Sequence, residues 1–132
     1  MAPVDRRELG AIFIGGALGA GARSWLSELA GTHAGRWPWT TFAVNLLGCF
    51  LLGYLVTRLQ ERLPMTAYRR PLLGTGLCGG LTTFSTFQLE LLRMLDRDDV
   101  ALSLLYAGAS IAAGFLGVAI GTAIVRRARL TW

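Results

Sequence analysis

Lysine is absent from this 132-residue chain, and its one histidine, His33, falls in a short connection. The two cysteines, Cys49 and Cys78, both lie inside apolar stretches, where a free thiol behaves as a small hydrophobic group. Two cysteines placed in this way do not make a disulfide framework, and no ligand spacing indicates a metal site. The chain also shows no catalytic carboxylate pair, no Ser-His-Asp set and no phosphate-binding loop, so nothing in it favours an enzyme.

No soluble domain is present either, because 53% of the residues are hydrophobic and they gather in four apolar segments, 9–29, 37–57, 71–89 and 101–125. Segments of this length reach about 28–38 Å as helices, enough to cross a hydrocarbon core of about 30 Å. The sequence therefore predicts one all-α membrane domain over residues 1–132. It has four transmembrane helices, of which the third continues to about residue 95.

The first of these segments could also be a secretory signal peptide, because two arginines precede a short apolar run. The run continues into Trp25 and Leu26, however, and its removal would leave three helices without a packing partner. We therefore favour a retained first helix.

All 13 basic residues are arginine, against 8 acidic residues, which gives a net charge of +5. Nine arginines lie at the N-terminus, in the connection 58–70 and at the C-terminus, namely Arg6, Arg7, Arg58, Arg62, Arg69, Arg70, Arg126, Arg127 and Arg129. The other side has three, Arg36, Arg93 and Arg97, besides Arg23 inside the first span. This bias predicts that both termini are cytoplasmic. It indicates lipid headgroups as partners, and no nucleic acid, since a basic stripe on a soluble fold is missing.

The third segment contains an unusually polar stretch, GGLTTFSTF, at residues 79–87. Gly79 and Gly80 each weaken a helix by about 1 kcal/mol relative to alanine, so the stretch predicts a helix that is broken in mid-membrane. Broken backbone at this depth is tolerated where protein or a water-filled cavity satisfies it, and its free carbonyls can hold a cation. Phe84 and Phe87 follow at a spacing of three; they either pack or turn their electropositive ring edges toward an anion. Hydroxyl donors lie beside them, at Thr83, Ser85 and Thr86.

The first helix carries Gly15, Gly19 and Arg23 at intervals of four, on one face. The glycines are typical of close helix packing. An arginine within a span either faces a cavity or extends to the membrane surface, and its position near the helix end leaves both interpretations open.

Two further polar pairs are spaced by four residues, Thr41 with Asn45 in the second segment and Tyr106 with Ser110 in the fourth. Each pair lies on one helix face. Such groups either form hydrogen bonds between helices or donate into a polar path, and the sequence leaves both possibilities open.

The stretch GLCGGLTTFSTF at residues 76–87 resembles the third-helix signature of the Fluc (CrcB-type) fluoride channels. The glycine-rich first helix ending at Arg23, the WPWTT entry at 37–41 with Asn45, and Tyr106 with Ser110 are also similar to that family, so the resemblance covers all four helices. It implies a passive fluoride exporter in the cell's inner (plasma) membrane. The protein would be an antiparallel, dual-topology homodimer with two pores along the dimer interface.

The same resemblance implies roles for individual residues. The backbone carbonyls of Gly79 and Thr82 would hold a structural Na⁺ at the centre of the dimer, and Arg23 and Glu90 would lie at the vestibule. The fluoride path would be lined by Phe84, Phe87, Asn45, Thr41, Tyr106, Ser110, Thr83 and Ser85.

Three alternatives accompany this interpretation. The arginine count of nine against three does not suit a chain that inserts both ways, so either the bias is overridden or the chain pairs with an oppositely biased homologue. A small proton-coupled multidrug exporter would need a carboxylate within its first helix, where this chain has Glu28 at the very end. A non-transporting membrane subunit would tolerate leucine at Phe84 and Phe87 without loss of ion flux.

Overall fold

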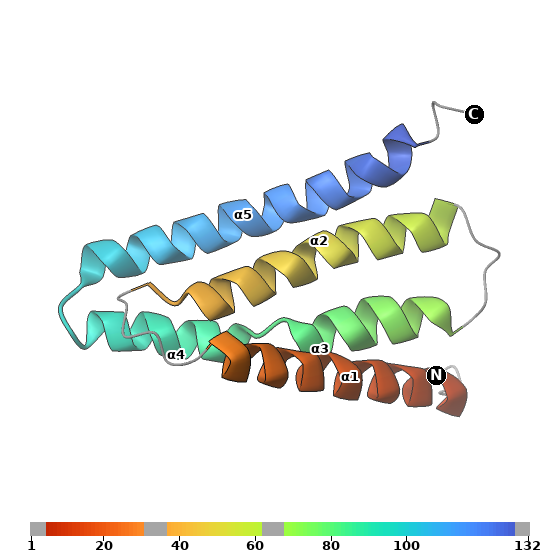
Figure 1. Cartoon of the computed structure of the whole chain (residues 1–132), viewed down its shortest axis with the longest axis horizontal. Helices are drawn as coiled ribbons and strands as arrows, with labels where there is room; N and C mark the ends of the chain where they lie inside the picture. Colours follow the sequence, from red (N-terminus) through yellow and green to blue (C-terminus); the bar gives the residue numbers. More distant parts are fainter. Residues whose placement is uncertain (1–4, 31–36, 62–67, 129–132) are drawn as a thin grey trace.

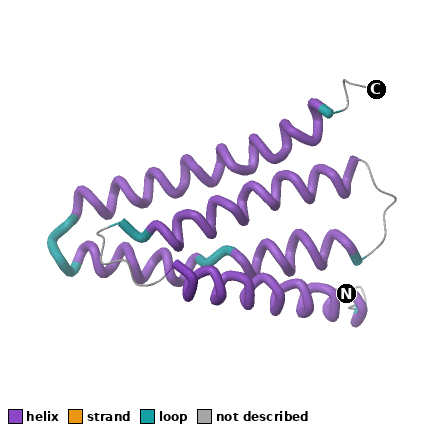
Figure 2. The backbone as a smooth tube through the Cα atoms, viewed as in Figure 1, coloured by secondary structure: helices purple, strands orange, loops and turns teal. Residues whose placement is uncertain are grey.

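The computed structural model describes residues 5–30, 37–61 and 68–128, and within these ranges it consists of helices joined by short connections (Figure 2). Three helices, α1 (Arg6–Ala30), α2 (Trp39–Glu61) and α5 (Val100–Arg127), are long and apolar enough to cross a membrane. The protein is therefore an all-helical membrane protein. Four positions considered above lie outside the described residues, namely His33, Arg36, Arg62 and Arg129.

The third apolar segment is divided into η1 (Pro71–Cys78), which has π-helical hydrogen bonding, α3 (Gly79–Leu81) and α4 (Phe84–Leu95). Between α3 and α4 the backbone of Thr82 and Thr83 is extended, with ψ angles of 153° and 117°. Figure 2 shows this stretch as a short loop between two helical pieces. Gly79 and Gly80 are themselves helical, so the interruption follows the glycines instead of falling on them.

The helices lie side by side in the order α5, α2, the η1–α3–α4 row and α1 (Figure 1). α5 and α2 run in one direction, and the η1–α3–α4 row and α1 run in the opposite direction, so the start of α1 and the end of α5 lie at the same end of the molecule. The closest neighbours are α2 with α5, and α1 with η1 and α3. The break between α3 and α4 consequently lies between α1 on one side and α2 on the other.

Glycine makes both of these close helix contacts possible. A Cβ atom at Gly15 or Gly19 of α1 would collide with a backbone carbonyl of η1, and a Cβ atom at Gly53 or Gly121 would collide with a carbonyl across the α2–α5 contact. Backbones that approach this closely gain dispersion contacts that bulkier side chains would prevent, which is how helices associate in lipid. Large apolar side chains such as Phe13, which is 77% exposed, cover the outer surface of the helices.

Candidate functional site

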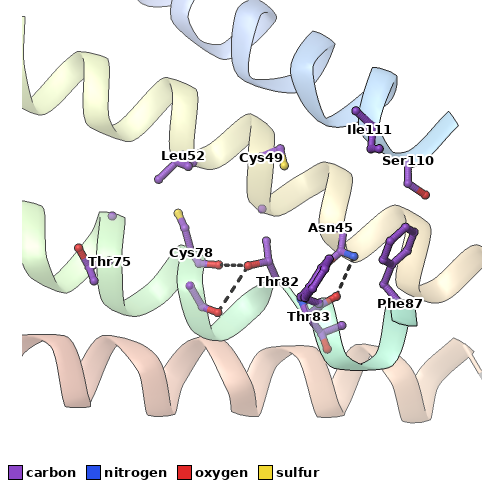
Figure 3. Close-up of a pocket in the computed structure, with 14 residues that line it drawn as sticks. Asn45, Cys49, Leu52, Thr75, Cys78, Thr82, Thr83, Phe87, Ser110 and Ile111 are labelled. Atoms are coloured by element: carbon purple, nitrogen blue, oxygen red, sulfur yellow. Dashed lines mark hydrogen bonds between the residues drawn. The ribbon is translucent and has the colours of Figure 1, made fainter. Parts of the chain in front are cut away.

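The extended backbone at Thr83 is held by one side chain from α2. The Thr83 N–H donates to Asn45 Oδ1 over 2.8 Å, and Asn45 Nδ2 donates to the Thr83 carbonyl over 3.1 Å (Figure 3). The amide therefore satisfies both main-chain groups of the residue, as a neighbouring strand would. Asn45 is therefore the side chain that pairs the extended backbone of the break with α2.

The two threonines of the break also hold the helix ends on either side. Thr82 donates from both its backbone N–H and its hydroxyl to the Cys78 carbonyl, each over 3.0 Å, which closes α3. Thr83 is the N-cap of α4, where its Oγ1 accepts from the Thr86 N–H over 3.2 Å and donates to Thr86 Oγ1 over 3.0 Å. Threonine is a favoured residue at this position because its oxygen pairs with a free N–H of the first turn.

A pocket of about 440 Å³ opens beside the break, between α2, the η1–α3–α4 row and α5 (Figure 3). Its polar lining includes Asn45, Thr82, Thr83 and Ser110, and its aromatic lining is Phe84 and Phe87. Among the described residues no charged side chain lines the pocket, and glycines form part of its wall, at positions 48, 74 and 79. It therefore offers neutral donors and ring surfaces.

The two phenylalanines of this pocket differ in their surroundings. The Phe84 ring is 69% exposed, and its centroid lies 6.0 Å from that of Phe87. The Phe87 ring lies 5.3 Å from the fully buried ring of Tyr106. Near Phe87, the Ser110 hydroxyl is buried and has no hydrogen-bond partner in the described part of the chain. The pocket thus contains a hydroxyl that can still donate a hydrogen bond.

Glu90 of α4 accepts hydrogen bonds from two other helices. Thr41 donates to Glu90 Oε1 over 2.6 Å, and the Tyr106 hydroxyl donates to Glu90 Oε2 over 2.7 Å. The sequence had suggested Thr41 and Tyr106 as donors to a path and Glu90 as a residue of the pore mouth, without connecting them. Nothing in the spacing indicates that the three meet, because they come from three separate helices.

A second pocket, of about 320 Å³, lies on the α1 side of the break. Its lining is mainly polar: Arg23, Ser24, Ser27, Thr41, Val44, Thr83 and Thr86. Arg23 extends into the protein, where its Nη1 donates to the Thr82 carbonyl over 3.4 Å. Thr83 lines both pockets, so the break forms part of the wall between them.

Most of the residues named from the sequence line one of the two pockets, but Tyr106, Glu90 and Ser85 line neither. Ser85 is exposed, and its hydroxyl lies 3.4 Å from the Thr83 hydroxyl. Sequence reasoning missed Ser24 and Ser27, which lie one and four residues after Arg23. The Trp37 ring packs edge-on against Tyr106, with ring centroids 5.1 Å apart.

Side-chain metal ligands do not cluster in the described residues: no group of three or more His, Cys, Asp or Glu could hold an ion there. Backbone carbonyl oxygens are the other groups that could coordinate a metal ion. The Thr83 N–H is bonded to Asn45, so it does not bond back to the Gly79 carbonyl, which receives a long 3.5 Å bond from Thr82 Oγ1. The break therefore leaves the Gly79 and Thr82 carbonyls weakly bonded.

Comparison with known proteins finds similar sequences over nearly the whole chain. The sequence model of the family described as CrcB-like protein, Camphor Resistance (CrcB), matches residues 10–122. A protein of Mycobacterium bovis named fluoride-specific ion channel FluC 1 is 57% identical over 96% of both chains. A protein of the same name from Mycolicibacterium paratuberculosis is 58% identical over 98% of both chains, and the fluoride-specific ion channel FluC 2 of Nocardia farcinica is 40% identical over 94% of this chain and 89% of its own.

The family match covers the break, both pockets and the Glu90 contacts, and the relatives cover nearly all of this chain. The chain belongs to the CrcB-like protein family.

Proposed function

We propose that this protein is a channel through which fluoride leaves the cell passively, which lowers fluoride toxicity. The observation that carries the proposal is the 57% identity, over 96% of the chain, to a protein named fluoride-specific ion channel. The protein is an ion channel and not an enzyme. We place it in the plasma membrane, since a passive exporter acts at the boundary of the cell.

The break supports a fourth membrane crossing. We propose that η1, α3 and α4 cross the bilayer once, as a single span interrupted at Thr82 and Thr83. Their combined range, Pro71 to Leu95, is about as long as α1 and α2. The hydrogen bonds from Asn45 make the interruption tolerable at membrane depth.

The 440 Å³ pocket beside the break supports an assembly of two antiparallel chains. Phe84 is 69% exposed beside the polar groups of the break, in a chain whose outer surface otherwise faces lipid. A second, inverted copy would cover this opening and enclose one pore against each chain. The proposal thus accounts for polar groups that lipid would leave exposed.

Fluoride is small and strongly hydrated, so its path must replace water with donors that do not hold it too tightly. The proposed donors are Asn45 and the buried Ser110 hydroxyl, together with the ring edges of Phe84 and Phe87. Thr41 and Tyr106 already donate to the Glu90 carboxylate. Fluoride that reaches them competes with that carboxylate, which keeps the site weak and favours release. Thr83 and Ser85 complete the proposed lining.

Arg23 gives the second pocket its positive charge. Fixed positive charge at the mouth of a path raises the local concentration of anions. The pocket around Arg23 contains Ser24 and Ser27, whose hydroxyls can donate to an anion that enters. We therefore propose that this pocket is the fluoride vestibule, with Glu90 between it and the phenylalanines.

A structural Na⁺ fits the carbonyls freed by the break. Gly79 and Thr82 offer neutral carbonyl oxygens on the wall of the 440 Å³ pocket beside the break. The space around Gly79 is open, since a Cβ atom there would meet nothing within 4 Å. Unwound backbone of this kind coordinates Na⁺ in membrane transporters. When bound, the ion would supply positive charge that holds the two breaks together. Thr82 would give up its long bond from Arg23 to become a ligand.

The first test is fluoride efflux from proteoliposomes loaded with KF, with valinomycin as the K⁺ shunt and a fluoride electrode as the detector. We expect fast loss of fluoride and little loss of chloride. Phe84→Leu and Phe87→Leu should remove most of the flux, because leucine lacks an electropositive ring edge. The matched control is Phe13→Leu, at an exposed position of α1 outside both pockets, which should conduct normally.

Unchanged flux in both pocket variants would favour another path. Folded protein without any flux would indicate a non-transporting subunit or a missing partner chain. A proton-coupled exporter is disfavoured because the carboxylate inside the protein, Glu90, lies on α4 and is held by two hydroxyls.

The arginine bias bears on the identity of the second chain. Either the bias is overridden and the protein is a dual-topology homodimer, or the chain pairs with an oppositely oriented homologue. A tag at the C-terminus, tested for accessibility from both membrane faces, separates these two cases. Equal labelling from both faces supports the homodimer. One orientation combined with fluoride flux from the purified chain alone would contradict an antiparallel pair.

A further inference from the structure

Besides the two pockets at the break, a groove of about 520 Å³ runs between α2 and α5 on the outside of the bundle. Its lining is apolar throughout: Ala43, Leu46, Leu47, Phe50, Ala113, Leu116, Gly117 and Ile120. The α2 members recur every three or four residues and so form one face of the helix. Asn45 and Cys49, which line the 440 Å³ pocket beside the break, lie on the other face. The groove therefore faces away from the proposed fluoride path.

Small residues create the hollow. Alanine at positions 43 and 113 and glycine at 117 leave space between larger neighbours. Gly117 cannot be enlarged freely, since a Cβ atom there would lie 3.3 Å from the Leu46 carbonyl. The groove is thus an open furrow on the surface, along the contact of two helices that are both long and apolar enough to cross a membrane.

Three side chains at intervals of four residues, Phe50, Tyr54 and Arg58, continue the groove along α2 as an aromatic and basic ladder. Phe50, in the groove, stacks on Tyr54 with ring centroids 6.3 Å apart. Arg58, one turn further, donates from Nη1 to the Tyr54 hydroxyl over 2.8 Å, and its guanidinium lies 5.8 Å from the centre of that ring. The Arg58 side chain is therefore held over the end of the ladder, in an exposed position.

On α5, Arg127 lies seven residues after Ile120 and so shares its helix face. It is exposed, and in the described residues no carboxylate is bonded to Arg127 or to Arg58. Arg126, by contrast, is paired with Glu61 over 3.3 Å. Arg58 and Arg127 thus lie toward the ends of α2 and α5, which are at the same end of the molecule (Figure 1), and neither is bonded to a carboxylate of the described residues.

The dimensions match one leaflet of a bilayer. Ala43 and Arg58 are separated by about 22 Å along α2, at about 1.5 Å per residue. Half of a hydrocarbon core is about 15 Å, and the headgroup layer adds about 5–8 Å. Acyl chains laid in the groove would bring a phosphate to the level of Arg58 and Arg127.

We propose that this groove binds one anionic phospholipid of the bilayer, with an acyl chain along Ala43, Leu47 and Ile120 and its phosphate between Arg58 and Arg127. The site does not depend on fluoride conduction. Charge complementarity selects the anionic lipid, because both arginines present free donors and a neutral headgroup carries a cation that they would repel.

The test is native mass spectrometry of the full-length protein in detergent, titrated with phosphatidylglycerol or with phosphatidylcholine of the same acyl chains. We expect tighter binding of phosphatidylglycerol. The double variant R58Q/R127Q should weaken it by roughly 20- to 30-fold, since each arginine near a membrane surface contributes about fivefold. R126Q is the matched control and should change binding less than about twofold, because Glu61 already neutralises that charge.

The apolar half of the site is tested separately. Ala43→Leu fills the groove at an exposed position and should weaken binding of both lipids, whereas Ala119→Leu, exposed on α5 outside the groove, should not. Equal binding of the two lipids by the natural protein would overturn the proposal. So would an R126Q effect as large as that of the double variant, since binding would then follow diffuse charge. Equal effects of the two leucine variants would also overturn it.

Discussion

The α2–α5 contact and the break at Thr82 and Thr83 solve the same physical problem in opposite ways. Both bring backbone close to a neighbouring helix in the absence of water. In the α2–α5 contact the side chains are small, so that Gly53 and Gly121 lie against carbonyls across the contact within helices that stay intact. At the break the helical bonds are lost, and Asn45 pairs with the main chain of Thr83. Glycine therefore permits close packing of intact helices, whereas the break is paired by a polar side chain from another helix.

Adjacent residues show the same contrast. A Cβ atom at Gly80 would collide with the Gly16 carbonyl of α1, whereas one at Gly79 would meet nothing within 4 Å. The first glycine of the pair thus lines the pocket and the second holds α1 and α3 together. The two adjacent glycines, which in the sequence look like a single helix-weakening pair, therefore have different structural roles.

The largest expected effect is at the α2–α5 contact. Gly121→Ala places a Cβ atom against the Phe50 carbonyl, and because the obstacle is backbone it cannot rotate away. We expect a loss of at least about 1–3 kcal/mol in the free energy of unfolding. Gly108→Ala is the control on the same helix, where a Cβ atom meets nothing within 4 Å; it should gain up to about 1 kcal/mol. Reversible denaturation in mixed micelles measures both, and equal values would refute the role of close packing.

A comparable or slightly smaller effect is expected at the partner of the break. Asn45→Leu leaves the Thr83 N–H and carbonyl without their partner, at a cost of about 1–3 kcal/mol for an unsatisfied buried group. Fluoride flux should fall together with stability, because the wall between the two pockets loses its support. Gln60→Leu removes an exposed amide from the same helix and should change neither. If Asn45→Leu kept full stability, the break would not depend on this residue.

The smallest effect concerns the start of α4. Thr83→Ala removes the capping oxygen that accepts from the Thr86 N–H and should cost about 1 kcal/mol. Thr83→Ser keeps that oxygen and should cost clearly less. The difference between the two variants, measured by the same denaturation, isolates the cap from the bonds to Asn45, which use only the Thr83 backbone. Identical values would mean that the cap contributes nothing.

Sequence reasoning identified the family and the all-helical membrane class, and comparison with known proteins confirms both. It succeeded because long apolar segments and the GGLTTFSTF stretch are local signals. It located the interruption near the right residues but attributed it to Gly79 and Gly80, whose intrinsic weakness as helix formers is real. In the structure both stay helical: Gly80 lies against α1, and the extended backbone falls on Thr82 and on Thr83, with which Asn45 pairs.

The sequence by itself determined that α1, α2 and α5 are long and apolar enough to cross a membrane, since hydrophobicity and length decide that without reference to neighbours. It also determined the charge asymmetry and the supply of hydroxyls and rings near the break. The tertiary structure alone decided which polar groups meet. Thr41, Glu90 and Tyr106 belong to three helices, and Arg23 reaches Thr82 from a fourth segment of chain. Helix packing sets these distances, and hydrogen bonds are made or lost over a few tenths of an ångström, which no spacing along the chain can specify.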